Sequence, residues 1–431
     1  MRRAGAALAV FLAGATLRAQ DIALVGATIH PVSGPDISGG TVLIHAGKID
    51  FVGPAAHLVA GVERVDVAGK HIYPSLFPPV TVLGLVEIQS VRSTIDTTEI
   101  GEINPQARAD EAMNFDSELL PVARSAGILV AGVTPIEGIV SGTLSVMKLE
   151  GWTREDATVK APAAMTVFWP DLDIDRSATA RFSVRLQEKR RDEAVRKLEV
   201  VFADAKAYAK ARAAEGQSGV PRHDVDPKLE ALVPAVEGKI PVIVVAHSVA
   251  QIRAALAWAK KNNIKLVLGG VEDGWRVAGE IAAAQVPVVV ETLDLPHRSD
   301  APYDVLYANP GVLAKAGVRV AFNDGADPFA AATVRNLVEQ AGVAVAYGMP
   351  RDKAVAAMTL EPARILNVAD RLGSLENGKD ATLIVTDGDI LDLRTRVVAA
   401  YLDGKLLDLT DKQKRLYERY RNRPKPNPAE R

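Results

Sequence analysis

The chain has 431 residues, of which 48% are hydrophobic, 24% charged and 5% aromatic, and this composition is typical of a globular protein with a large core rather than a disordered chain. The 51 basic residues nearly balance the 53 acidic ones, so the overall charge favours neither nucleic acid nor an anionic membrane, and a small neutral molecule is the expected partner. Cysteine is absent, which excludes disulfides, thiolate metal ligands and cysteine nucleophiles.

The N-terminus predicts a cleaved signal peptide over residues 1–20. Arg2 and Arg3 precede an apolar stretch that ends at Leu17 and is too short to span a bilayer. We therefore expect an exported protein, periplasmic or secreted, without a membrane span in the mature chain.

Short alternating runs follow from Asp21, separated by glycines, and similar runs return near the other end of the chain. They predict hairpin strands over 22–25, 41–44, 48–52, 381–385 and 397–402, with Asp403-Gly404 as a hairpin turn. Two β segments so far apart predict one composite β-sandwich, formed by residues 21–72 and 378–410.

Between these segments, apolar strand-like runs alternate with amphipathic helical ones. Strands are expected over 242–246, 265–268, 286–290 and 317–321, and helices over 177–213, 249–261, 275–284, 331–347 and 351–366. This alternation predicts a parallel sheet closed by an outer ring of helices, a (β/α)8 barrel over residues 73–377. Residues 411–431 are expected to form a basic helix and tail.

Several strings of the sequence resemble the amidohydrolase superfamily, in particular its imidazolonepropionase-like branch of secreted bacterial members. They are Gly47-Lys-Ile-Asp-Phe-Val-Gly53, Val67-Ala-Gly-Lys-His-Ile-Tyr-Pro74, Gly317-Val-Arg-Val-Ala-Phe-Asn-Asp324, Thr359-Leu-Glu-Pro-Ala-Arg-Ile-Leu366 and Gly373-Ser-Leu-Glu-Asn-Gly-Lys-Asp-Ala-Thr-Leu-Ile-Val385. The resemblance implies a TIM barrel with a small β-sandwich, hydrolysis of non-peptide C–N bonds, and a divalent metal such as zinc.

The chain departs from the family where histidines hold that metal. Val80 and Val82 stand at the two positions after the first barrel strand where the family has ligand histidines. Val245 stands where the family has the ligand histidine of the fifth strand. Valine cannot coordinate a metal, so no metal ligand is assigned and a degenerate metal site is expected. Oxygen ligands from Glu87, Glu137 or Glu291 stay open as a replacement.

Asp324 matches the acidic residue of the eighth strand, which the resemblance implies is a general base. The alternative is a structural role, because Asn323-Asp324-Gly325 is also a sequence that favours a turn. His247, just past a strand, is a candidate substrate-binding residue, with capping of the next helix as the alternative. His297 and Arg298 are candidates for binding a carboxylate.

Lys148 and Glu87 complete the candidate substrate-binding residues. Some superfamily members carry a metal-bridging lysine near the place of Lys148, and an ion pair with Glu87 or Glu137 is the structural alternative. No chemistry is expected of the other histidines, which are His30, His45, His57, His71 and His223.

Three functions remain open at this point. The chain is a hydrolase that works without a fixed metal, a non-catalytic binder of a small molecule, or a subunit that pairs with an intact amidohydrolase as a homo- or hetero-oligomer.

Overall fold

The computed structural model describes residues 21–54, 61–177, 179–215, 217, 224–292, 301–325 and 327–423. The expected signal peptide, His57, His223, His297 and Arg298 therefore lie outside the described residues. None of the helices in the described ranges is both long and apolar enough to cross a membrane.

The described residues form two sheets. The first has eight strands in the order β15-β14-β13-β5-β1-β2-β3, with β4 paired to β1. Its strands are β1 (Ile22–Ile29), β2 (Ile37–His45), β3 (Lys48–Gly53), β4 (Glu63–Asp66), β5 (His71–Pro74), β13 (Leu383–Thr386), β14 (Val397–Leu402) and β15 (Lys405–Leu406).

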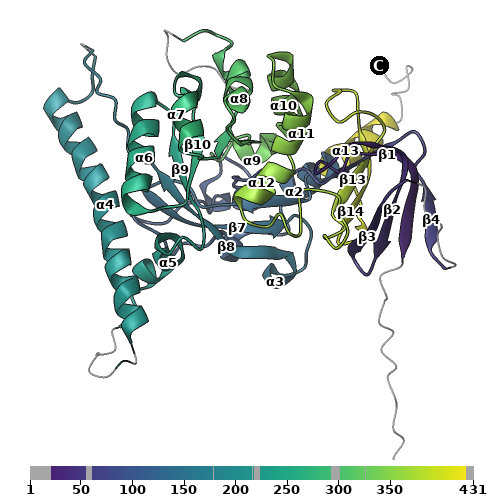
Figure 1. The fold of residues 1–431 in the computed structure, drawn as a ribbon, viewed down its shortest axis with the longest axis horizontal. Coiled ribbons are helices and arrows are strands. Elements are labelled where there is room, and N and C mark those ends of the chain that lie inside the picture. The colour runs from purple at the N-terminus through teal and green to yellow at the C-terminus, as the bar shows by residue number, and fades with distance from the viewer. Residues whose placement is uncertain are drawn as a thin grey trace, which may run out of the picture.

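This first sheet joins both ends of the chain, because β13 pairs with β5. Its two tight hairpins have turn residues with positive φ, namely Ala46 and Gly47, and Asp403 and Gly404. The expected Asp403-Gly404 turn is confirmed. Figure 1 shows the β1–β4 strands and the C-terminal strands β13 and β14 side by side at one end of the molecule. The assignment of domain boundaries stays a prediction.

The second sheet has seven strands in the order β12-β11-β10-β9-β8-β7-β6 among the described residues. They are β6 (Val130–Val133), β7 (Val140–Lys148), β8 (Thr158–Phe168), β9 (Val242–Ala246), β10 (Leu266–Gly270), β11 (Val288–Val290) and β12 (Val320–Phe322). The sheet curls into a half-barrel, so the described residues do not show the expected complete (β/α)8 barrel.

Short connections explain this difference. Only residues 134–139 separate β6 from β7, and β7 is joined to β8 through the four-residue helix α3 (Arg154–Ala157). Parallel neighbours need a longer crossover, so both pairs are antiparallel and β7 runs against the other strands of its sheet. The β8–β12 strands are parallel to one another.

The segment expected as the first barrel strand forms isolated bridges, from Leu76 to Ile128 just before β6 and from Thr81 to Val133 in β6. Pro78 and Pro79 lie between them and have no N–H to donate, which prevents a continuous ladder. Gly132 makes the close approach possible, because a Cβ there would lie 2.0 Å from the carbonyl oxygen of Pro79.

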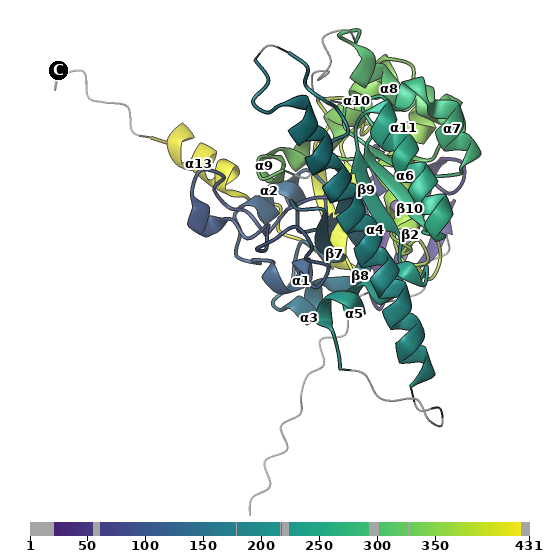
Figure 2. The same cartoon turned by 90° about the vertical axis from the view of Figure 1, so that its left-hand side faces the viewer.

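Helices cover the outer side of the curled sheet (Figure 1). The described helices are α1 (Ala109–Ala112), α2 (Leu119–Ser125), α3, α4 (Val184–Ala214), α5 (Pro227–Val236), α6 (Val249–Asn262), α7 (Ala278–Ala283), α8 (Val305–Lys315), α9 (Ala330–Thr333), α10 (Leu337–Ala346), α11 (Arg351–Ala357), α12 (Leu360–Ile365) and α13 (Lys412–Arg421), with short 3-10 turns η1 (Arg92–Thr94), η2 (Gly274–Arg276) and η3 (Val334–Asn336). The expected long helix is found as α4. In Figure 2, α13 projects from the body beside α2.

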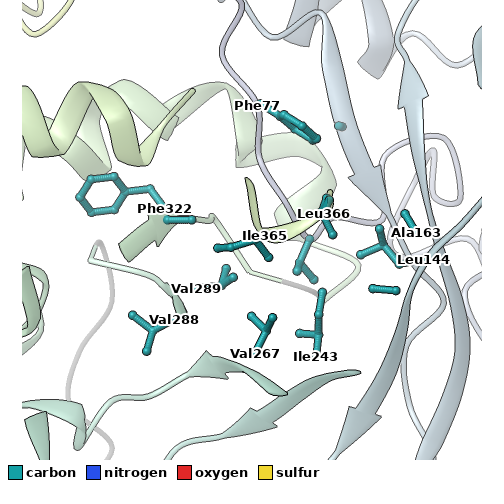
Figure 3. Close-up of a cluster of buried hydrophobic side chains, with 14 of the residues drawn as sticks. Phe77, Leu144, Ala163, Ile243, Val267, Val288, Val289, Phe322, Ile365 and Leu366 are labelled. Carbon is teal, nitrogen blue, oxygen red and sulfur yellow. The ribbon is translucent and has the colours of Figure 1, made fainter. Parts of the chain in front are cut away.

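The interior of the curled sheet is filled with apolar side chains, so it is a packed core. Figure 3 shows Ile243, Val267 and Val289 from three neighbouring strands in one cluster with Ile365 and Leu366 at the end of α12. All five side chains belong to one cluster of buried residues. Polar chemistry is therefore restricted to the edges of the sheet, as in closed barrels.

Candidate functional site

The C-terminal ends of β8–β12 meet at one edge of the curled sheet, because these strands are parallel. Polar residues lie within two positions of the ends of four of them: His247 after β9, Glu272 after β10, Thr292 after β11 and Asp324 after β12. The strands place these side chains at the edge where α/β proteins bind ligands.

His247 and Glu272 form a pair at this edge. The Nδ1 atom of His247 lies 2.9 Å from Oε1 of Glu272, and the two side chains are 48% and 21% exposed. Gly270 makes room for the ring, because a Cβ at this position would lie 2.7 Å from His247 Cε1. Its φ of +79° is also one that glycine adopts without strain.

Helix α6 begins directly after His247 and fixes the loops around it. Ser248 is the N-cap of this helix and forms a reciprocal capping box with Gln251. The side chain of Gln251 accepts hydrogen bonds from the backbone N–H groups of His247 at 3.0 Å and Ser248 at 3.1 Å, and it donates to the carbonyl oxygens of Trp169 and Pro170 at 3.3 Å. Ser248, and not His247, therefore provides the cap.

A cavity of about 380 Å³ opens beside the His247–Glu272 pair. Trp169 closes one side of it and is held to β9 by a hydrogen bond from its backbone N–H to the carbonyl oxygen of Val245, at 2.9 Å. The described lining residues, which come from the ends of β8, β9 and β10 and from the start of α8, are Trp169, Asp171, Asp173, His247, Ser248, Gln251, Glu272, Asp273, Ala301, Val305 and Leu306.

Asp324 lies two strands farther along the edge and does not line this cavity. Its Oδ1 accepts a hydrogen bond from Nε2 of Gln340 on α10 at 2.6 Å, while its buried Oδ2 has no hydrogen-bond partner among the described residues. Burial raises the pKa of Asp324 to about 6, and contacts with Thr333 and Gln340 oppose this rise only in part. This carboxyl group can therefore exchange a proton near neutral pH.

Lys148 is at the opposite edge of the sheet, because β7 runs against its neighbours. The expected ion pair with Glu87 or Glu137 is wrong: its Nζ lies 2.5 Å from Oδ2 of Asp403, in the turn between β14 and β15. Lys148 thus links the two sheets, and the structure does not bring it to the other candidate residues.

Glu87 is occupied in a loop before α2. Its carboxylate accepts hydrogen bonds from the hydroxyl of Ser117 at 2.5 Å and from the backbone N–H of Glu118 at 3.2 Å. It holds the start of α2 and does not line the cavity.

Zinc, the metal that the resemblance implies, does not fit the side chains that the structure describes. Val80 and Val82 are 3% and 0% exposed and belong to the apolar core. Within the described ranges, no group of three or more histidine, aspartate or glutamate side chains is arranged to hold a metal ion. A catalytic zinc site needs three such ligands.

The sequence singled out Asp324 and His247 as candidates but gave no indication of their partners Gln340 and Glu272 or of Trp169. The Ser248-x-x-Gln251 spacing is a capping-box signal that could have placed Gln251 at the site. The other partners come from separate elements and carry no local signal.

Comparison with solved structures agrees with an α/β fold built around a curled sheet. The structure superposes on an amidohydrolase from Thermotoga maritima MSB8 with a TM-score of 0.79 and 25% sequence identity, covering 90% of this chain and 99% of that one. It also superposes on molinate hydrolase with a TM-score of 0.52, 17% identity and coverage of 90% and 95%. Phenylurea hydrolase B gives a TM-score of 0.54, 16% identity and coverage of 90% and 97%.

The sequence itself points to the same family. Residues 298–412 match the amidohydrolase family, and the chain is 21% identical over 397 residues to amidohydrolase tasK of Hapsidospora irregularis. The match covers 85% of this chain but only 39% of that relative. The family match thus covers the C-terminal part of the chain, residues 298–412, and the similar solved structures include an amidohydrolase. The imidazolonepropionase-like branch stays a prediction.

Proposed function

We propose that this amidohydrolase-family protein binds a small molecule in the cavity over β8, β9 and β10 and that it does so without the zinc of the family. One observation carries the proposal: the cavity is at the strand ends, yet Asp324, the candidate base, is not among its lining residues. A binding cavity separated from the candidate base favours recognition over catalysis.

The size and lining of the cavity support this function. Its volume of about 380 Å³ lies in the range of small-molecule sites. Its walls combine apolar side chains, such as Leu306, with ionisable ones, such as His247. Gln251 ties the loops after β8 and β9 together by its side-chain hydrogen bonds, so the two walls are held in place without a ligand.

The binding proposal is tested by thermal unfolding of the full chain in a screen of hydantoins, N-acyl amino acids, dipeptides and amines. A ligand should raise Tm in the unaltered protein and raise it much less in His247→Ala. His45→Ala is the matched control, because His45 pairs with Asp21 at 2.7 Å on the surface of the other sheet. A screen without any stabilising compound, or equal stabilisation of both variants and the unaltered protein, would overturn the proposal.

Hydrolysis of a non-peptide C–N bond without a metal is the second candidate function, and the raised pKa of Asp324 favours it. A carboxyl group with a pKa of about 6 can accept a proton from water close to neutral pH. General base catalysis alone contributes about 10²–10⁴-fold, so turnover should be slow.

One assay separates binding, metal-free hydrolysis and zinc-dependent hydrolysis. The screened compounds are incubated with the protein with and without added zinc, and bound metal is measured by elemental analysis. Binding without turnover supports the main proposal, whereas metal-free turnover lost in Asp324→Asn supports the second. Stoichiometric zinc together with turnover that requires it would contradict both.

Pairing with an intact amidohydrolase is a prediction of its own. The curated relative extends well beyond the matched 39% of its length, which leaves room for a further unit in the same polypeptide. Co-purification of a separate amidohydrolase chain with this protein would support it.

A further inference from the structure

We infer that the cavity over β8, β9 and β10 selects a small organic cation, in which a protonated amine or a guanidinium is attached to an apolar body. This inference rests on the proposed binding function and specifies the class of ligand. It departs from the neutral partner that the balanced overall charge predicts, because the local charge of the cavity is not balanced.

Carboxylates dominate the charged lining. Asp171, Asp173, Glu272 and Asp273 line the cavity, and no lysine or arginine in the described part of the chain does so. Carboxylates gathered in a concave site with apolar walls attract and concentrate cations.

Two of these carboxylates already have side-chain partners. Glu272 pairs with His247 at 2.9 Å, and Asp273, which is 6% exposed, pairs with Arg276 at 3.2 Å. These contacts account for the two acidic side chains that follow β10. No ion pair among the described residues compensates the charge of the other wall.

Asp171 and Asp173 form that other wall, after the end of β8. Both are exposed, and neither forms an ion pair with any residue in the described ranges. The backbone N–H of Asp173 donates to Oδ1 of Asp171 at 2.9 Å, so both carboxylates belong to one turn. The uncompensated negative charge therefore lies at one place on the cavity wall.

Trp169 supplies a second and independent feature for a ligand. It lines the cavity and is 6% exposed, and its indole Nε1 is buried without a hydrogen-bond partner among the described residues. An indole ring offers an aromatic surface against which an organic cation can pack.

The remaining wall is apolar. Val305 and Leu306, in the first turn of α8, are 8% and 3% exposed and also line the cavity. A bare metal ion would gain nothing from these side chains. A ligand with an apolar body and a cationic end would use both walls.

The test measures binding of three compounds of matched shape to the full chain by isothermal titration calorimetry at low ionic strength. They are phenethylamine, 2-phenylethanol and 3-phenylpropanoate, which are cationic, neutral and anionic. The amine should bind about tenfold more tightly than the alcohol, with the carboxylate weakest, and added salt should weaken binding of the amine only.

Asp171→Asn/Asp173→Asn is the diagnostic variant, because asparagine keeps the turn hydrogen bond and removes both charges. It should weaken binding of the amine about fivefold or more and leave binding of the alcohol unchanged. Asp50→Asn/Asp352→Asn is the matched control, since both aspartates are exposed and lie outside the cavity. This control should bind the amine like the unaltered protein.

The outcomes distinguish this inference from the proposed function. If the alcohol or the carboxylate binds in the cavity as tightly as the amine, the cationic class is wrong but the binding function stands. If the amine does not bind and the thermal screen also yields no ligand, both are wrong. Equal loss of binding in the diagnostic and control variants would also overturn the assignment to Asp171 and Asp173.

Discussion

The side-chain amide of Gln340 lies 2.6 Å from Oδ1 of Asp324 and donates a hydrogen bond to it. The oxygen of the same amide accepts from the backbone N–H of Thr292 at 2.5 Å. One residue of α10 therefore ties the end of β11 to the end of β12 and fixes the carboxyl group that sequence reasoning singled out. Because Oδ2 of this carboxyl group is buried without a described partner, burial disfavours the ionised form relative to that of an exposed aspartate.

Asp324→Asn should stabilise the protein above neutral pH. The folded-state pKa is raised from 3.8 to about 6, so the stability that the protonated carboxyl contributes is present below about pH 4 and is lost as pH rises through about 6. Asparagine imitates the protonated form and keeps the acceptor for Gln340. The free energy of unfolding should increase by about 1 kcal/mol near pH 7.5, since the side chain is only partly buried, and the gain should vanish as pH approaches about 4.

Urea unfolding at several pH values measures this difference. Asp352→Asn, on an exposed side chain, is the control and should show no such pH dependence. If Asp324→Asn lowers the unfolding free energy equally at every pH, the carboxylate is needed for hydrogen bonding and its burial does not destabilise the folded protein.

Gly270→Ala should displace the imidazole of His247. A Cβ at Gly270 would lie 2.7 Å from Cε1 and 2.8 Å from Nδ1 of this ring, and the φ of +79° is unfavourable for alanine. We expect a loss of about 1–2 kcal/mol in unfolding free energy and weaker binding of any cavity ligand. Thermal unfolding with and without the ligand measures both effects.

Gly279→Ala is the matched control for this substitution. Gly279 is in α7, and nothing lies within 4 Å of the position of its Cβ. Alanine should stabilise this helix by about 0.5–1 kcal/mol. If both variants behave alike, the contact between Gly270 and His247 does not shape the cavity.

Local signals explain which parts of the structure could be predicted. The Asp403-Gly404 hairpin follows from turn chemistry within two residues, and β9 and α6 follow from their periodicity. The direction of β7 could not be read in this way, because an apolar run looks the same whichever way the strand is paired. The closed barrel was expected for that reason.

The site shows the same division. Asp324 and His247 could be placed at one edge of the sheet because each follows an apolar strand. Gln340 and Glu272 could not be assigned to them, since these contacts join elements that lie apart in the sequence. The position of Lys148 could not be predicted for the same reason, because the edge of the sheet at which it lies depends on the direction of β7.

A double-mutant cycle on Lys148 and Asp403 should show that this ion pair couples the two sheets. The side chains are 17% and 36% exposed and 2.5 Å apart, so their interaction is less screened than that of a surface pair. Lys148→Met and Asp403→Asn should give a coupling energy of about 1 kcal/mol in urea unfolding. Asparagine suits Asp403 because this residue has a positive φ of 48°. A coupling energy near zero would show that the pair contributes nothing.

His30 should make the protein less stable as pH falls below about 6.5. Burial lowers the pKa of His30, and the nearby His71 lowers it further, while Asp36 and Asp389 oppose these effects. The ring is stacked on Tyr73 with centroids 4.1 Å apart. Because the folded-state pKa lies below the unfolded value of 6.5, the stability from the neutral ring is present above that pH and is lost as pH falls toward the folded-state value.

Replacing His30 by glutamine should flatten the pH dependence of unfolding free energy between about pH 7 and 5, by at most about 1.4 kcal/mol per pH unit for a single group. Urea unfolding at intermediate pH values measures the slope. His45→Gln is the control, because its side chain is 62% exposed. An unchanged slope in His30→Gln would assign the acid sensitivity to other groups, and a steeper slope would mean that His30 is protonated in the folded protein and held by Asp36, 2.9 Å away.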